Sequence, residues 1–160
     1  MQIAKAFGAQ VTGVCSTPNV EMVASIGADR VIDYTREDFT GAGRRYDLLI
    51  DIAGNRTLAE TRRVLVPRGT LVVVGGPDRG RWIGPLGRSV KLVLLSPAVS
   101  QRLVSFLAHQ SKDDLAMLRE LLQAGKVTPV IDRTYPLSET AEAMRYLERG
   151  HAQGKVVITM

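Results

Sequence analysis

Residues with reactive side chains are few in this sequence, and their spacing forms no catalytic or metal-binding pattern. The single cysteine, Cys15, and the two histidines, His109 and His151, lack the ligand spacing of a zinc site. Asp47 and Asp51 lie four residues apart, which in a strand places both on one face. Because this segment is otherwise apolar, we interpret the two acids as satisfied polar residues or as a ribose contact, in preference to an acid–base pair.

A glycine-containing segment over residues 84–89 superficially resembles a phosphate-binding loop. Trp82 stands where the first glycine of such a loop belongs, and Arg88 replaces its lysine. The expected strand also follows this segment instead of preceding it. We therefore reject the phosphate-loop interpretation.

The clearest structural pattern is one strand–helix–strand unit, with strands expected over 46–52 and 69–74 and a helix over 57–66. Both strands are almost continuously apolar, which is typical of parallel strands covered on both faces. Small residues end each strand, where a ligand can approach the backbone. These residues are Ala53, Gly54 and Asn55 after the first strand, and Gly75 and Gly76 after the second. A purely structural role is the alternative for each of them.

The other expected elements alternate in the same way. Strands are expected over 11–15, 30–34, 90–95, 127–135 and 155–159, and helices over 2–8, 18–26, 97–109, 112–124 and 139–149. Thr17, Ser111 and Ser138 are the expected N-terminal caps of three of these helices. Alternating strands and helices predict an α/β fold with a parallel sheet.

Composition excludes several classes of protein. The net charge of +5 comes from arginines spread along the chain without interleaved aromatic residues, which does not favour nucleic-acid binding. No apolar run approaches the roughly 20 residues of a membrane span, and the first residues lack a signal-peptide layout. One cysteine is typical of a reducing compartment, so we expect a cytoplasmic protein.

Several segments, in their order, resemble the medium-chain dehydrogenase/reductase superfamily, and most closely its zinc-free, quinone oxidoreductase-like branch. The segments are 1–9, 11–17 (VTGVCST), 27–34 (GADRVIDY), 46–51 (YDLLID), 125–132 (GKVTPVID) and 154–158 (GKVVI). Together they extend over essentially the whole chain. Their order is far more specific than any one of them.

The resemblance implies that this chain corresponds to the carboxyl-terminal half of such a protein. In the family, a substrate domain, the first Rossmann strand and a glycine-rich turn precede the helix over residues 2–8. Residues 1–126 are then a Rossmann nucleotide-binding domain without that strand and turn. Residues 127–160 match the segment that completes the substrate domain. An alternative is that Met1 marks a mistaken start.

The resemblance also implies a cofactor site, position by position. Ser16 and Thr17 match positions near the adenosine ribose, and Tyr34 matches a tyrosine that contacts the 2′-phosphate of NADP. Hydroxyl residues there favour NADP over NAD, although Pro18 stands where a basic residue often follows. Ala53, Gly54 and Asn55 match the turn beside the ribose. Gly75 and Gly76 match the turn nearest the nicotinamide, and Leu95 matches an edge strand near the carboxamide.

By this resemblance, the function is NAD(P)H-dependent hydride transfer to a small-molecule quinone, enone or related carbonyl substrate, without zinc. No residue is assigned a catalytic role, and binding of NADPH by the chain alone is expected to be weak because the glycine-rich turn is lacking. A homodimer is expected through the strand over 90–95, with no nucleic-acid or membrane partner. The alternative is a non-catalytic fragment or pseudoenzyme that acts as an assembly or weak nucleotide-binding module.

Overall fold

The protein divides into two compact units. The structure, a computed structural model, describes residues 1–41, 43–52, 54–74, 100–105, 111–150 and 152–160. One unit contains Met1–Glu37 and Ser111–Met160, and the other contains Asp38–Gln110. The boundary at 126/127 concerns the domains of the family and stays a prediction.

The first unit begins with helix α1 (Gln2–Ala6), strand β1 (Thr12–Cys15), a 3-10 turn η1 (Thr17–Asn19), helix α2 (Val20–Ser25) and strand β2 (Arg30–Asp33). Strands β1 and β2 pair in parallel, with Thr12 opposite Arg30 and Cys15 opposite Asp33. The chain reverses after each helix at a glycine with positive φ, +80° at Gly8 and +98° at Gly27, where a side chain would be strained.

The core beneath these strands explains why Gly13 stands in the middle of β1. Val23 of α2 and Ile32 of β2 are buried. A Cβ atom on Gly13 would lie 2.5 Å from Cγ1 of Val23. The missing side chain therefore lets α2 pack directly onto β1.

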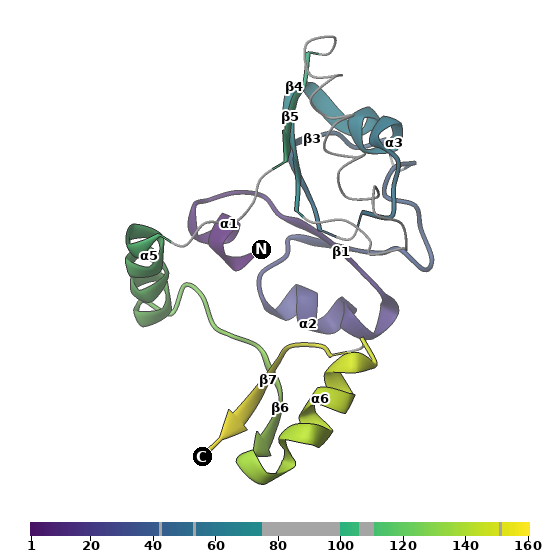
Figure 1. Cartoon of the computed structure of the whole chain (residues 1–160). Coiled ribbons are helices and arrows are strands. Elements are labelled where there is room, and N and C mark those ends of the chain that lie inside the picture. The colour runs from purple at the N-terminus through teal and green to yellow at the C-terminus, as the bar shows by residue number, and fades with distance from the viewer. Residues whose placement is uncertain (42, 53, 75–99, 106–110, 151) are drawn as a thin grey trace. The chain divides into compact units, whose positions relative to one another are not determined.

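In the described part of the second unit, three strands form a parallel sheet in the order β3 (Tyr46–Asp51), β4 (Leu65–Val73) and β5 (Arg102–Ser105), with helix α3 (Leu58–Arg63) beside it (Figure 1). Its core consists of Leu65, Leu71 and Val73, and three partly buried residues pack against it: Leu49, Leu58 and Leu103. The α/β class with parallel strands is thus confirmed.

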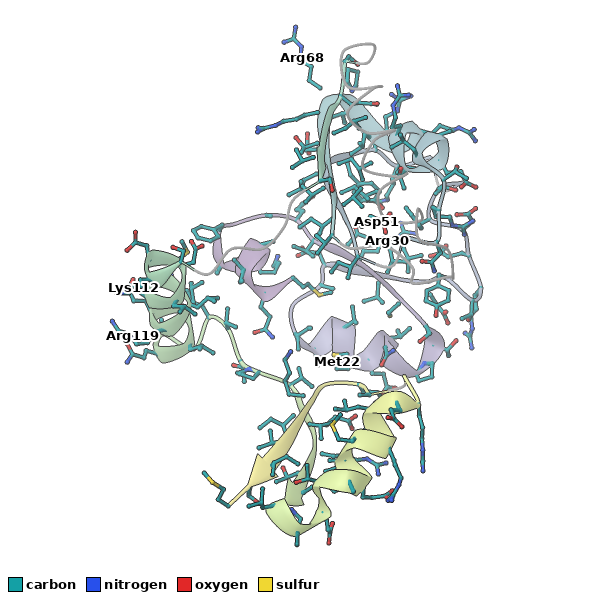
Figure 2. All side chains as sticks on the ribbon, viewed as in Figure 1. Met22, Arg30, Asp51, Arg68, Lys112 and Arg119 are labelled. Carbon is teal, nitrogen blue, oxygen red and sulfur yellow. The ribbon has the colours of Figure 1, made fainter. Side chains whose placement is uncertain are left out.

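Helix α3 is shorter than expected because β4 begins early. We expected the helix to reach Val66 and the strand to begin at Gly69, but β4 begins at Leu65. Leu65 pairs with Tyr46, and the pairing shifts register before Leu48 meets Thr70. Arg68 has φ of 67° in this irregular stretch. Figure 2 shows Arg68 and Asp51 at opposite ends of the sheet.

The helix expected over 97–109 is wrong for residues Arg102–Ser105, which form strand β5. Arg102 pairs with Thr70 and Ser105 with Val73, parallel to β4. The apolar residues Leu103 and Val104 fit a helix pattern and a strand equally well. Packing of Leu103 on the core of the sheet decides for the strand. The strand expected over 90–95 lies outside the described residues.

The carboxyl-terminal part of the first unit contains helix α5 (Lys112–Gln123), strand β6 (Ile131–Pro136), a 3-10 turn η3 (Leu137–Glu139), helix α6 (Thr140–Glu148) and strand β7 (Lys155–Thr159). Ser111 caps α5, as expected, by accepting a hydrogen bond from the Asp114 amide. Ser138 is not a cap, because it lies inside η3 and α6 begins two residues later. Strands β6 and β7 pair in parallel, with α6 beside them (Figure 1).

Hydrogen bonds between distant segments hold the first unit together. The Gln2 amide nitrogen donates to the Thr128 carbonyl at 2.8 Å, and the Thr128 N–H donates back to Gln2 Oε1 at 2.6 Å. Gln153 Nε2 donates to the Pro18 carbonyl at 3.2 Å. None of the described helices is both long and apolar enough to cross a membrane.

Candidate functional site

The carboxyl ends of β1 and β2 bring together three residues that the sequence placed at a cofactor site. Because the strands are parallel and Cys15 lies opposite Asp33, Ser16 and Thr17 follow β1 at the same edge where Tyr34 follows β2. The Tyr34 N–H donates to the Cys15 carbonyl at 3.0 Å, which ties the two strand ends together. The side chains of Thr17 and Tyr34 are exposed, and Ser16 is half-buried.

Asp33 is the centre of the hydrogen bonds at this edge. Its carboxylate accepts from the Thr17 hydroxyl at 2.5 Å, from the Thr35 hydroxyl at 2.7 Å and from the Thr35 N–H at 3.0 Å. Arg36 Nε lies 3.5 Å from the same carboxylate, whose side chain is only 12% exposed. The Thr17 hydroxyl, followed by Thr35 and Arg36, holds the pKa of Asp33 below its ordinary value against the opposing effect of burial.

Thr17 is therefore not the helix cap that we expected. Ser16, in extended conformation, is the N-cap of η1, while the Thr17 hydroxyl turns toward Asp33. The Thr17 and Thr35 hydroxyl oxygens lie 2.9 Å apart, but each hydroxyl has a single hydrogen. When both hydrogens go to the carboxylate, the lone pairs of the two hydroxyls are left as acceptors.

A buried acceptor without a partner in the described part of the chain lies at the same edge. Asn19 Nδ2 donates to Ser16 Oγ at 3.1 Å, but Asn19 Oδ1 is buried and has no hydrogen-bond partner there. Such groups are uncommon in folded proteins and are usually satisfied by a ligand or an ordered water molecule. The donors and acceptors here suit a polyhydroxyl group such as a ribose.

Cys15 is not suited to nucleophilic chemistry at this edge. Burial, and then the nearby Asp33 carboxylate, raises the pKa of the Cys15 thiol above its ordinary value. The thiol therefore remains protonated at neutral pH, and the nucleophilic form is the thiolate.

The turn after β3 contains the second group of predicted site residues. The Gly54 N–H donates to Asp51 Oδ1 at 2.8 Å, and Gly54 has φ of 68°. Asp51 thus has a hydrogen-bond partner, in line with one of the two interpretations left open from the sequence, whereas Asp47 is exposed. The positive φ means that any side chain at Gly54 strains the backbone, whether or not a ligand lies nearby.

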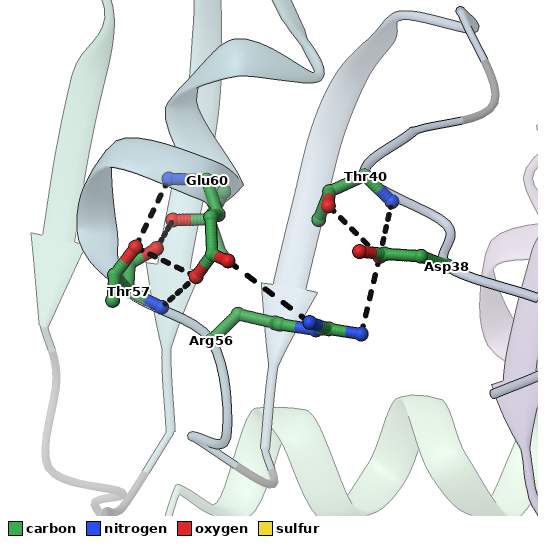
Figure 3. Close-up of polar contacts among 6 residues, drawn as sticks. Asp38, Thr40, Arg56, Thr57 and Glu60 are labelled. Carbon is green, nitrogen blue, oxygen red and sulfur yellow. Dashed lines mark hydrogen bonds and ion pairs between the residues drawn. The ribbon is translucent and has the colours of Figure 1, made fainter. Parts of the chain in front are cut away.

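An ion-pair network around Arg56 holds the segment that follows this turn (Figure 3). Arg56 Nη2 lies 3.1 Å from Asp38 Oδ1, and Nη1 lies 4.0 Å from Glu60 Oε1. Asp38 accepts from the amide and the hydroxyl of Thr40 at 2.9 and 2.8 Å. The network therefore links the residues before β3 to the beginning of α3.

Glu60 and Thr57 close the first turn of α3 with a capping box (Figure 3). The Glu60 N–H donates to Thr57 Oγ1 at 3.3 Å, and the Thr57 N–H donates to Glu60 Oε2 at 2.7 Å. Two N–H groups at the helix start are satisfied within the chain. The capping box thereby holds the α3 end of the turn that contains Gly54 and Asn55.

Four of the nine predicted site residues lie outside the described residues: Ala53, Gly75, Gly76 and Leu95. Of the other five, Ser16, Thr17 and Tyr34 lie at one edge, and Gly54 and Asn55 lie in the turn after β3. The assignment of all nine to cofactor binding stays a prediction.

Sequence reasoning missed Asn19, Asp33, Thr35 and Arg36. A local signal existed for two of them, because an aspartate followed two residues later by threonine at the end of a strand is typical of a turn closed by the carboxylate. The bond from Thr17 had no local signal, because it spans 16 residues. Among the described residues, no group of three or more His, Cys, Asp or Glu side chains is arranged to hold a metal ion.

Comparison with known proteins identifies the family. The sequence profile of the zinc-binding dehydrogenases matches residues 26–158. The mitochondrial NAD(P)H oxidoreductase of Mus musculus is 36% identical over 176 residues, covering 100% of this chain and 44% of the relative. The chloroplastic NADPH-dependent alkenal/one oxidoreductase of Arabidopsis thaliana is 33% identical, covering 99% of this chain and 36% of that protein.

A solved structure supports the fold. The quinone oxidoreductase from Coxiella burnetii is similar with a TM-score of 0.79 and 28% identity, over 99% of this chain and 47% of that one. This likeness confirms the Rossmann-like α/β fold. The chain spans about half the length, or somewhat less, of the relatives that it matches. The chain belongs to the zinc-binding dehydrogenase family, within the quinone oxidoreductase-like branch of the medium-chain dehydrogenase/reductase superfamily.

Proposed function

We propose that this chain supplies the nucleotide-binding part of an NAD(P)H-dependent oxidoreductase that reduces a quinone, enone or related carbonyl compound. The observation that carries the proposal is the polar edge formed by Ser16, Thr17 and Tyr34 at the carboxyl ends of two neighbouring parallel strands. Ligands of open parallel sheets bind at this end of the strands. The names of the relatives, which include quinone and alkenal/one oxidoreductases, support the reaction class.

The residues at this edge fit the adenosine end of the cofactor. The lone pairs of the exposed Thr17 and Thr35 hydroxyls are acceptors for ribose hydroxyl groups. We propose NADP(H) as the cofactor, with NAD(H) less favoured. β1 is followed by Ser16 and Thr17, without the acid that in many Rossmann domains accepts from the ribose of NAD.

When bound, the reduced nicotinamide supplies the hydride, and the protein's part is to hold and orient it. Gly54 and Asn55 are proposed to contact the nicotinamide half of the cofactor, together with Ala53, Gly75, Gly76 and Leu95. The proposal assigns no proton donor to this chain and includes no zinc.

The assembly and location follow the resemblance to the family. Residues 127–160 are proposed to complete a substrate domain, and two copies are proposed to associate through residues 90–95. A cytoplasmic location is proposed from the sequence, although similar proteins include mitochondrial and chloroplastic ones.

The test is an NMR titration of the full chain with NADPH. We expect shifts of the amide signals of Thr17, Tyr34 and Thr35 with a dissociation constant near the millimolar range, equivalent to about −4 kcal/mol. Thr17→Val should weaken binding, whereas Thr128→Val, in the same unit, should not. No shift at these amides up to about 10 mM NADPH would refute the cofactor site.

A second candidate is a non-catalytic assembly module. It is favoured by the exposed apolar side chains along and just after β3, since Leu48, Ile50 and Ile52 are 52%, 56% and 71% exposed. Concentration-dependent light scattering with Ile50→Lys, combined with the absence of NADPH binding, would favour this candidate.

A further inference from the structure

The acidic residue at the cofactor edge is already saturated by its own chain. A carboxylate offers about four lone-pair positions. Asp33 receives two hydroxyl donors and one amide donor from Thr17 and Thr35, and Arg36 Nε occupies the remaining side at 3.5 Å. Asp33 therefore has no free position for a ribose hydroxyl, which is the usual way in which an acid selects NAD.

Arg36 is held at one end only. Its Nε faces Asp33, while the side chain as a whole is 75% exposed. Its terminal nitrogens have no partner among the described residues. These nitrogens form a planar fork that matches phosphate oxygens in geometry.

The neighbours of Arg36 are those expected around an adenosine ribose. Arg36 comes two residues after Tyr34, and Asp33 links it to Thr17 at the end of the adjacent strand. Arg36 thus brings charged donors to this edge, while the carboxylate with which it pairs already accepts three hydrogen bonds.

We propose that Arg36, anchored by Asp33, recognises the 2′-phosphate that distinguishes NADP(H) from NAD(H). This assignment rests on the proposed function, because it assumes that a dinucleotide binds at this edge. Asp33 is a positioning residue, which restricts the guanidinium to the carboxyl end of β2. Arg36 is the residue that determines the cofactor form.

The expected effect is moderate because the site is exposed. Exposed ion pairs are weak, but a two-point contact to a phosphate is stronger than a single surface pair. We expect the 2′-phosphate to improve affinity about five- to tenfold, and the advantage to decrease in high salt.

The experiment compares two probes that differ only in this group, 5′-AMP and its 2′-phosphorylated form, by NMR titration of the full chain. Arg36→Gln should abolish the preference for the phosphorylated probe over 5′-AMP. Arg36→Lys should retain part of it, since the charge remains without the fork. The matched control is Arg145→Gln, which removes an arginine that is 65% exposed and pairs with Glu142 at the same three-residue spacing.

The outcomes separate the two proposals. Loss of the preference in Arg36→Gln, with Arg145→Gln like the wild type, supports the role of Arg36. A wild-type chain that binds both probes equally, or a preference that survives Arg36→Gln, overturns it and leaves the dinucleotide site intact. If neither probe binds, the adenosine site itself is refuted, and the assignment of Arg36 is refuted with it.

Discussion

Replacing Gly154 by alanine should destabilise the carboxyl-terminal strand pair strongly. A Cβ atom built on Gly154 would lie 2.5 Å from the Val130 carbonyl oxygen and 3.0 Å from its carbonyl carbon. Real Cβ atoms essentially never come this close, so the backbone must move. A backbone carbonyl cannot turn aside as the end of a flexible side chain can.

The movement also affects a hydrogen bond. The Val130 carbonyl accepts from the Lys155 N–H at 2.7 Å, at the point where β7 begins to pair with β6. Overpacking destabilises by about 1–3 kcal/mol. Weakening of this bond adds about 0.5–1.5 kcal/mol. We therefore expect a loss of about 2–4 kcal/mol and a decrease in melting temperature of about 5–15 °C for a chain of this size.

The assay combines thermal melting with amide hydrogen exchange. The Lys155 amide should lose protection in Gly154→Ala more than amides of β1 do. Gly41→Ala is the matched control, because among the described residues its Cβ would meet the Asp38 carbonyl oxygen alone, at an ordinary contact distance of 3.6 Å. Melting of Gly154→Ala within about 2 °C of the wild type would refute the reasoning, since about 1 kcal/mol or less would then have been lost.

Two further predictions concern the polar networks. Asp33→Asn should lower the melting temperature at pH 7 and make the melting temperature less dependent on pH. The lowered pKa of Asp33 stabilises the fold above the ordinary carboxyl pKa, and this stabilisation is lost as pH falls through the folded-state pKa. Melting temperatures of the two proteins that change in parallel from pH 7 to pH 3 would contradict this. Thr57→Ala should destabilise the unit containing α3 by about 1 kcal/mol through loss of its N-cap, measured by urea unfolding. Glu60→Gln is its control, because the glutamine oxygen can still accept from Thr57 while the carboxylate charge and its 4.0 Å ion pair with Arg56 are lost; an equal effect of both variants would argue against the cap.

Much of the fold could be predicted because its signals are local. Strand conformation is indicated by the continuous apolar runs of β3 and β4, and helix ends are indicated by the glycines after α1 and α2. Both kinds of signal depend on neighbouring residues. The order of the family segments along the chain also pointed to the Rossmann-like fold. Because parallel strands end at the same edge of a sheet, Ser16, Thr17 and Tyr34 could be expected together after β1 and β2.

The rest depended on contacts between residues far apart in the sequence. Arg102–Ser105 fit a helical pattern, and only pairing with β4 and packing of Leu103 on its core make them a strand. Thr17 has the side chain of a helix cap, but a carboxylate 16 residues later provides a stronger, charged partner. The sequence by itself thus determined the class of fold and the edge at which a cofactor is expected. Only tertiary structure decided that Asp33 accepts from Thr17 and Thr35 and that Arg36 has donors without a partner among the described residues, because hydrogen bonds between neighbouring strands depend on spatial register and not on local spacing.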